Sequence, residues 1–302
     1  MKNDNCNYGG QAIIEGVMMR SPFKYAIAVR KPDKEIILKI GKLRSLSDRI
    51  KFLKWPIFRG IINLIESLTL GLKALTYSAE QATGEEDKIN NVEMFFTILI
   101  AFVLFILIFI ALPTTIARYL DKYLSSLIVY NLFEGILRIG IFIFYLYFIS
   151  KIKDIKRVFE YHGAEHKVIY TYEAGEELKV DNVKKYSTLH PRCGTSFIFI
   201  VLIISILVFS LLGKQTLLLR ITYRVIIIPL IAGLSYEILK LSAKNMDKIF
   251  IKWVVMPGLW FQKLTTKEPD EAQIEVAIKA LKGVLPEPEQ DQNIKSEVKN
   301  NV

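Results

Sequence analysis

Four long apolar runs constrain the fold of this chain more than any other feature. Residues 92–112 read VEMFFTILIAFVLFILIFIAL, with Glu93 as the only charged side chain, and residues 197–213 read FIFIVLIISILVFSLLG, with none. Two further runs of similar length, 127–150 and 221–241, contain a few charged residues. A hydrocarbon core about 30 Å thick is crossed by roughly 20 helical residues. The runs therefore predict a mainly α fold, a polytopic membrane helical bundle of about four transmembrane helices.

The distribution of charge predicts the orientation of these helices. The net charge is +10, and Lys and Arg are dense in residues 1–91, in 151–192 and after 240, but sparse in the connections 113–126 and 214–220. Because cationic loops stay on the cytoplasmic side, we expect both termini and the central loop there. The excess of positive charge then reflects membrane topology and contact with the lipid bilayer, and we expect no nucleic acid as a partner.

The N-terminal region predicts a small cytoplasmic α+β cap on the bundle. Residues 8–46 are rich in glycine and β-branched residues, and their alternation predicts a hairpin around residues 31–34. Residues 55–77 have apolar side chains at helical spacing, and their charges share one narrow face. This pattern favours an amphipathic helix in the membrane interface, although a fifth span is the alternative.

These patterns divide the chain into six segments. They are a cytoplasmic N-terminal region (1–90), a first pair of spans (91–150) and a histidine-bearing cytoplasmic segment (151–195). These are followed by a second pair of spans (196–242), an interfacial segment with a short amphipathic helix (243–285) and a disordered tail (286–302).

All three histidines of the chain lie in the central cytoplasmic segment. His162 and His166 are four residues apart, so on a helix both imidazoles share one face and can bind the same cation. With Glu165 they form the order His-x-x-Glu-His, the inverted zinc-peptidase pattern in which the Glu serves a bound water. The segment therefore predicts a metal site with Glu165 as the catalytic carboxylate.

A second pair, His190 and Cys193, comes directly before the third apolar run. A His and a thiolate three residues apart on a turn are suitable zinc ligands. Together with His162 and His166 they supply a complete His₃Cys set for a divalent metal, with zinc the expected ion. Four protein ligands would close the coordination shell of a structural metal, whereas three would leave a position open for catalysis.

Readings without a metal are also consistent with these residues. The histidine pair could be hydrogen-bonded packing, and Cys193 could be a small residue at the membrane boundary. A nucleophilic pair of Cys193 with His190 or His166 is a further alternative. The confinement of every histidine to one segment, beside a cysteine and a glutamate, favours the metal site.

Further candidates are polar residues in or near apolar surroundings. Glu173 lies three turns along from the first histidine on the same helical face. Glu237, at the cytoplasmic end of the last run, could be a further ligand or could pair with Lys240. Glu15 and Arg20 flank a glycine-rich stretch that could lie over the site or form an ordinary tight turn.

Several motifs in a fixed order resemble the bacterial YqhQ family. These are GGQAIIEGVMMRSP, YHGAEHKVIYTYEAGEEL, STLHPRCGTSF, AGLSYE and PGLWFQKLTTKEPDEAQIEVAIKAL. The resemblance implies a multi-pass protein of the bacterial inner (cytoplasmic) membrane, of unknown function, in a family labelled a predicted metal-dependent enzyme. It adds weight to Glu15, Arg20, Arg192 and Glu237 as site residues, and it implies no substrate.

We therefore predict a membrane-embedded, metal-dependent hydrolase with its site on the cytoplasmic side. The first alternative is a non-enzymatic scaffold or assembly protein whose His/Cys metal site is structural. A transporter is the weakest alternative, since Glu134 and Arg138 can pair with each other and no charge falls near mid-membrane. Protein partners and homo-oligomers are left open.

Overall fold

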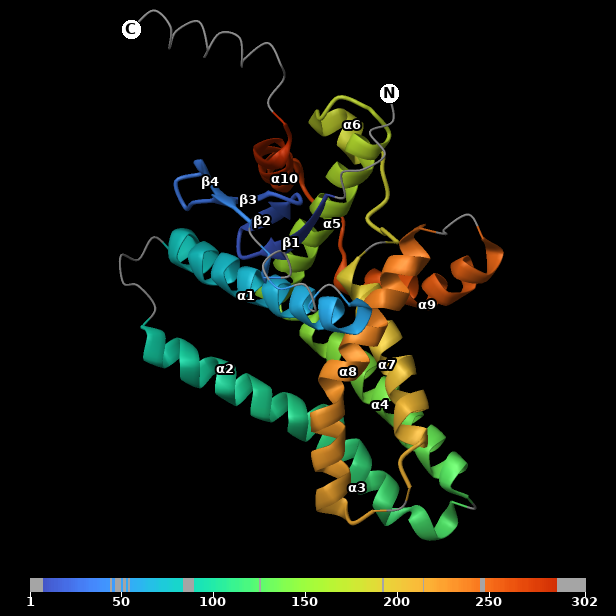
Figure 1. Ribbon diagram of the computed structural model, residues 1–302. Helices are drawn as coiled ribbons and strands as arrows, with labels where there is room; N and C mark the ends of the chain where they lie inside the picture. Colours follow the sequence, from blue (N-terminus) through green and yellow to red (C-terminus); the bar gives the residue numbers. More distant parts are fainter. Residues whose placement is uncertain are drawn as a thin grey trace, which may run out of the picture.

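The computed structural model describes residues 8–43, 45, 46, 50, 53, 55–83, 90–124, 126–191, 193–213, 215–244 and 248–286. It has two parts (Figure 1): a bundle of apolar helices, and a cap in which helices cover a small sheet. The predicted disordered tail lies outside the described residues, apart from Pro286.

The bundle is built from apolar helices, and all but the first of them pack side by side (Figure 1). A continuous helical stretch is formed by α2 (Asn91–Ile106), a π-helical turn (Leu107–Ala111) and α3 (Leu112–Tyr119), and it is followed by α4 (Leu127–Ile149), α7 (Gly194–Ser210) and α8 (Leu217–Lys244). Within the described residues, three helical stretches are long and apolar enough to cross a membrane, namely Val92–Tyr119, Leu127–Ile149 and Leu217–Ser242. Of the four predicted spans, the one at α7 is apolar but shorter, at 17 residues.

The helix that carries the histidines is separate from the second span. Helix α4 ends at Ile149, and α5 (Lys153–Glu173) begins after a turn. The break occurs because Ile152 has extended backbone angles and the Ser150 hydroxyl donates to the Tyr147 carbonyl. Consequently α5 packs on the sheet, whereas α4 packs on α3 and α7.

The sheet is an antiparallel meander of four strands in sequential order, β1 (Gly9–Ile13), β2 (Gly16–Arg20), β3 (Lys24–Arg30) and β4 (Ile36–Lys42). The hairpin predicted around residues 31–34 joins β3 to β4. The glycine-rich stretch before it forms a further hairpin, β1–β2, in agreement with the alternative of a tight turn there. Its tight turn holds Glu15 at φ 49°, in the left-handed region.

Both faces of the sheet are covered, so its strands bury alternate side chains on opposite sides. Val17 and Met19 pack with α5 and with α10 (Glu271–Val284), whereas Met18 and Ile27 pack against α1 (Pro56–Thr83). Full burial of each such side chain contributes about 1.5–3 kcal/mol. The cap therefore has three layers, with the sheet between α1 and the α5–α10 pair (Figure 1).

Helix α1 lies across the end of the bundle and meets α8 (Figure 1). It is not among the helices with the length and composition of a span. At the crossing, a Cβ added to Gly233 of α8 would lie 2.7 Å from the carbonyl oxygen of Ile57, and one added to Gly60 would lie 2.6 Å from the carbonyl of Gly233. The two glycines thus allow direct backbone contact between the helices. The predicted interfacial segment after α8 begins with another helix, α9 (Ile249–Thr265), which packs on α7.

The α1–α8 contact gives a first prediction. Gly233→Ala forces the two backbones apart and should destabilise the protein by about 1–3 kcal/mol, as overpacking does. The matched control is Gly140→Ala on α4, where an added Cβ meets nothing within 4 Å; it should be neutral or stabilising by up to about 1 kcal/mol. Thermal unfolding midpoints in detergent measure both, and equal midpoints for the two variants would contradict the contact.

Candidate metal centre

One face of α5 is part of the core of the cap, and the adjacent face carries the histidines. Tyr161, Ala164 and Val168 are buried against the sheet and α10. His162 directly follows the core residue Tyr161, and His166 comes two residues after the core residue Ala164. Their imidazoles lie side by side, with ring centroids 4.5 Å apart. The packing of the core face therefore fixes the rotation of the helix and the direction of both imidazoles.

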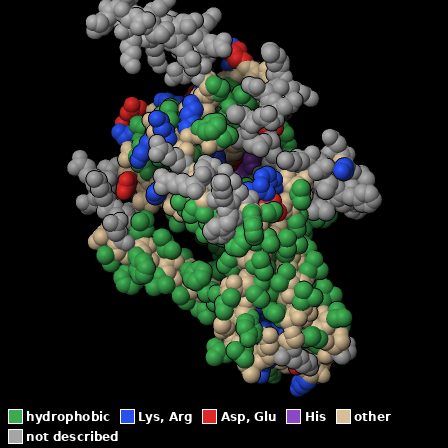
Figure 2. Space-filling view, viewed as in Figure 1, with side chains coloured by type: hydrophobic (Ala, Val, Ile, Leu, Met, Phe, Trp, Pro, Cys, Tyr) green, Lys and Arg blue, Asp and Glu red, His purple; other side chains and the backbone are tan. Residues whose placement is uncertain are grey.

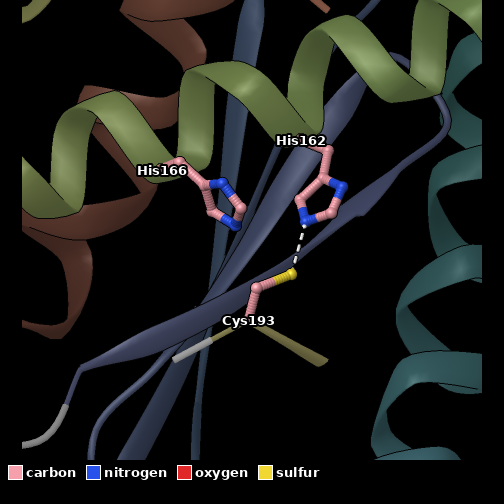
Figure 3. A group of neighbouring side chains, drawn as sticks. All are labelled: His162, His166 and Cys193. Atoms are coloured by element: carbon pink, nitrogen blue, oxygen red, sulfur yellow. Dashed lines mark hydrogen bonds between the residues drawn. The ribbon is translucent and has the colours of Figure 1, made fainter. Parts of the chain in front are cut away.

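Cys193 completes a three-residue group with these two histidines (Figure 3). Nε2 of His162 lies 3.2 Å from Cys193 Sγ. One ligand atom from each of the three residues lies within 4.8 Å of the other two, which is a spacing that could hold a metal ion. Cys193 is the N-cap residue of α7, so the group joins the cap to the start of an apolar bundle helix.

Each imidazole is oriented by a backbone carbonyl group behind it. Nδ1 of His162 lies 2.8 Å from the carbonyl oxygen of Thr265, and Nδ1 of His166 lies 2.5 Å from that of Thr188. Because a carbonyl oxygen only accepts, both Nδ1 atoms carry the proton and both Nε2 atoms keep a lone pair. Metal-binding histidines in proteins are oriented in this way.

A glycine between the two histidines allows these carbonyls to come close. A Cβ added to Gly163 would lie 2.0 Å from the carbonyl oxygen of Lys267 and 3.2 Å from the Thr188 side chain. The amide of Lys267 in turn donates to the Phe159 carbonyl at 2.9 Å. The chain after α9 therefore runs directly against the backbone of α5.

His190 lies beside the group but is not one of the three. Its ring is 5.6 Å from that of His166 and packs edge-on to Tyr170 at 4.5 Å, and its Nε2 lies 3.6 Å from a carboxylate oxygen of Glu173. Its backbone is held by the buried side chain of Gln262, which accepts from the His190 amide and donates to its carbonyl, both at 2.8 Å. The predicted four-ligand set is thus divided into a group of three and a neighbour.

Glu165 is buried next to the histidines, on the side of β1. The amide of Gly10 donates a hydrogen bond to its carboxylate. Burial raises the pKa of Glu165 above its ordinary value. Burial likewise lowers the pKa of His166, and it lowers that of His190 to about 4, so both imidazoles are neutral at neutral pH.

The remaining predicted site residues make contacts elsewhere. Glu15 forms an ion pair with Arg157 and accepts from the Tyr161 hydroxyl at 3.2 Å, which ties the β1–β2 turn to α5. Two others stabilise the packing of α1: Arg20 donates to Ser67 at 2.7 Å, and Glu237 pairs with Arg59 at 2.6 Å rather than with Lys240. Arg192 lies outside the described residues.

Sequence reasoning missed the residues that orient the ligands. Thr188 and Thr265 act through backbone carbonyls, which leave no trace in side-chain patterns. Gly163 and Gln262 do have a detectable signal, because both lie inside the motifs HGAEH and PGLWFQKLTTKEP, but neither is a ligand type. A histidine side chain is visible in Figure 2 between the cap and the bundle, so the site is not sealed inside the protein.

The hold of Gln262 on the His190 backbone gives a second prediction. Gln262→Leu leaves two buried backbone groups without partners and should cost about 1–3 kcal/mol of stability. It should also loosen the turn before Cys193 and speed alkylation of that thiol, measured with Cys6→Ser as background. The control, Gln81→Leu, removes a half-buried amide that makes no side-chain hydrogen bond among the described residues. A thiol that reacts at the same rate in both variants would refute this role.

Comparison with known proteins agrees with the motifs. The family model described as "Protein of unknown function (DUF1385)" matches residues 55–287. The chain is 37% identical over 297 residues to the uncharacterized protein YqhQ of Bacillus subtilis (strain 168), with 92% of each chain covered. No solved structure matches. The chain thus belongs to the YqhQ family, whose members are described as proteins of unknown function.

Proposed function

We propose that the protein is a metal-dependent hydrolase whose ion is held by His162, His166 and Cys193. The observation that carries this proposal is the convergence of two imidazole Nε2 atoms and one sulfur, with each Nδ1 atom tied to a backbone carbonyl. This arrangement directs the lone pairs of both imidazoles toward one point. Ordinary packing of two histidines does not require that.

The donor set fits zinc among the common divalent ions. Two imidazoles and a thiolate are borderline-soft ligands, which disfavour Mg²⁺ and Ca²⁺. Three protein ligands leave a fourth position for water or substrate, as in catalytic zinc sites. An ion with such a position supplies Lewis acidity and lowers the pKa of the water it binds.

The chain's own groups would provide the proton transfers. Glu165, next to a ligand in the sequence and hydrogen-bonded by the Gly10 amide, is the group that we assign to take a proton and return it to a leaving group. His190 and Glu173 lie beside the ligands and could contact the substrate. The backbone carbonyls of Thr188 and Thr265 keep both imidazoles in the ligating tautomer.

A nucleophilic Cys193–His162 pair is the competing candidate, because 3.2 Å is a hydrogen-bond distance and a helix N-terminus favours a thiolate. Such a pair needs one oriented imidazole, whereas two are oriented toward this sulfur. A purely structural metal in a scaffold protein would favour a fourth protein ligand, and His190 instead faces Tyr170 and Glu173. Both comparisons favour the metal-dependent hydrolase.

We further propose that the bundle crosses the inner membrane four times, with the shorter helix α7 as one of the spans. Its 17 residues extend about 26 Å, close to the hydrocarbon thickness. One cavity is lined both by the α3–α4 connection and by Gln215 and Arg220 after α7. That shared cavity supports a path for α7 along the full length of the bundle. With the charge distribution, four crossings would leave both termini and the metal site in the cytoplasm.

Metal content tests the ligand set. Protein purified in detergent without chelator should contain about one zinc ion per chain, the stoichiometry of a mononuclear site. His162→Ala and Cys193→Ala should each lose it, because two ligands do not retain a divalent ion, while His190→Ala and Glu165→Gln should keep it. Elemental analysis measures the content; native protein without stoichiometric metal would end the proposal, and loss in His190→Ala would indicate a four-ligand site.

Cobalt substitution tests whether a coordination position is open. With an open position, a hydroxamate should bind the Co²⁺ form and change its visible absorption bands, whereas a closed four-ligand site should not respond. Hydrolysis of fluorogenic ester, peptide and phosphodiester substrates should fall at least about a hundredfold in Glu165→Gln, typical of a lost general base. A Co²⁺ spectrum that does not change when the hydroxamate is added, or undiminished hydrolysis in Glu165→Gln, would argue against catalysis by this site.

Cysteine labelling tests the orientation. Lys122→Cys, in the α3–α4 connection, should react with a membrane-impermeant maleimide in intact cells, and Lys179→Cys, in the segment after α5, should react only after permeabilisation. Both lysines are exposed, and the parent protein corrects for the native cysteines. The reverse pattern would place the metal site outside the cytoplasm.

A further inference from the structure

The end of the bundle farthest from the sheet holds a cavity lined by cationic side chains. It lies between the end of α3, the turn Asp121–Tyr123 and the first turns of α4 and α8, and has a volume of about 480 Å³. Arg118, Lys122 and Arg220 line it, together with Asp121, Tyr119, Leu127, Tyr130 and Gln215. Lys and Arg side chains are visible at this end of the molecule in Figure 2.

The charge of the cavity is not balanced by the residues behind it. Behind Arg220 lies the buried carboxylate of Glu134, which accepts from Arg138 at 2.9 Å, from Arg224 at 2.6 Å and from Thr114 at 2.9 Å. Among the described residues here, five cations (Arg118, Lys122, Arg138, Arg220 and Arg224) accompany two carboxylates (Asp121 and Glu134). The surplus is positive.

Several buried polar atoms at this end have no hydrogen-bond partner among the described residues. Arg220 donates to the side-chain oxygen of Asn131 and packs over the Tyr130 ring, 4.1 Å from its centroid. Among the described residues, the buried donors Asn131 Nδ2 and Arg224 Nε have no acceptor, and the buried acceptor Gln215 Oε1, which lines the cavity, has no donor. Arg118 makes no ion pair within the described part of the chain. Buried guanidinium groups at the edge of an apolar bundle are costly unless an anion accompanies them.

We propose that this cavity binds a phosphate group. Guanidinium groups donate two parallel hydrogen bonds to phosphate oxygens, and two arginines and a lysine here surround a space of suitable size. The cavity lies where candidate spans end and begin, at Tyr119, Leu127 and Leu217, which is the depth of lipid headgroups. The phosphate can therefore come from an anionic phospholipid or from a soluble phosphate ester. This proposal does not depend on the metal site.

Two measurements on the full-length protein in a non-ionic detergent test the proposal. One follows the thermal unfolding midpoint as inorganic phosphate is added at constant ionic strength. The other uses native mass spectrometry to count lipids retained from an equimolar mixture of phosphatidylglycerol and phosphatidylcholine. The test variant, Arg118→Gln/Lys122→Gln, changes two exposed side chains and should fold normally. The control, Lys179→Gln/Lys185→Gln, makes the same charge change at exposed positions in the cap.

A saturable rise of the midpoint with phosphate would identify a soluble ligand, and preferential retention of phosphatidylglycerol would identify a lipid headgroup. In either case binding should weaken about tenfold in the test variant, as expected for lost charge-assisted hydrogen bonds near a surface, and should be unchanged in the control. Absence of both responses in the native protein would overturn the proposal. Equal binding by the test and control variants would overturn it as well.

Discussion

The candidate site depends on two hydrogen bonds from imidazole groups to backbone carbonyls. His162 donates to Thr265 and His166 donates to Thr188, and these bonds fix both the ring orientations and the tautomers. The two acceptors come from the end of α9 and from the loop before α7, far apart in sequence. Gly163 lets them reach α5, because any side chain there would occupy the position of the Lys267 carbonyl. The three segments must therefore dock before the ligands can converge.

This docking places the site at the junction of the cap and the bundle. Cys193 caps α7, α9 packs on α7, and α5 packs on the sheet and α10. A change in how the bundle sits against the cap would consequently alter the distance between the sulfur and the two imidazoles. Such a position suits a hydrolase that acts at a membrane surface, because the site borders both the polar cap and the apolar helices (Figure 1). The cationic cavity lies at the other end of the same helices.

The sequence predicted the local features well and the long-range ones poorly. The four-residue spacing of His162 and His166 places both imidazoles on one face of a helix. The bundle helices follow from long apolar runs, and the β3–β4 hairpin follows from alternating side chains. Cys193 lies with the two histidines, whereas His190 lies beside them, and its backbone is held by Gln262, which comes 72 residues later. For Glu237 the sequence left open a metal ligand or a partner of Lys240, and its observed partner Arg59, on a distant helix, leaves no pattern near it.

X-ray absorption at the metal edge tests the central claim most directly, because it counts the ligands around the ion. For purified, metal-loaded protein we predict one sulfur scatterer at about 2.3 Å and two imidazole nitrogens at about 2.0–2.1 Å, with one further light atom that is not imidazole. The sulfur should vanish in Cys193→Ala, and the imidazole count should stay at two in His190→Ala. A spectrum without sulfur, or with three imidazoles, would contradict the account.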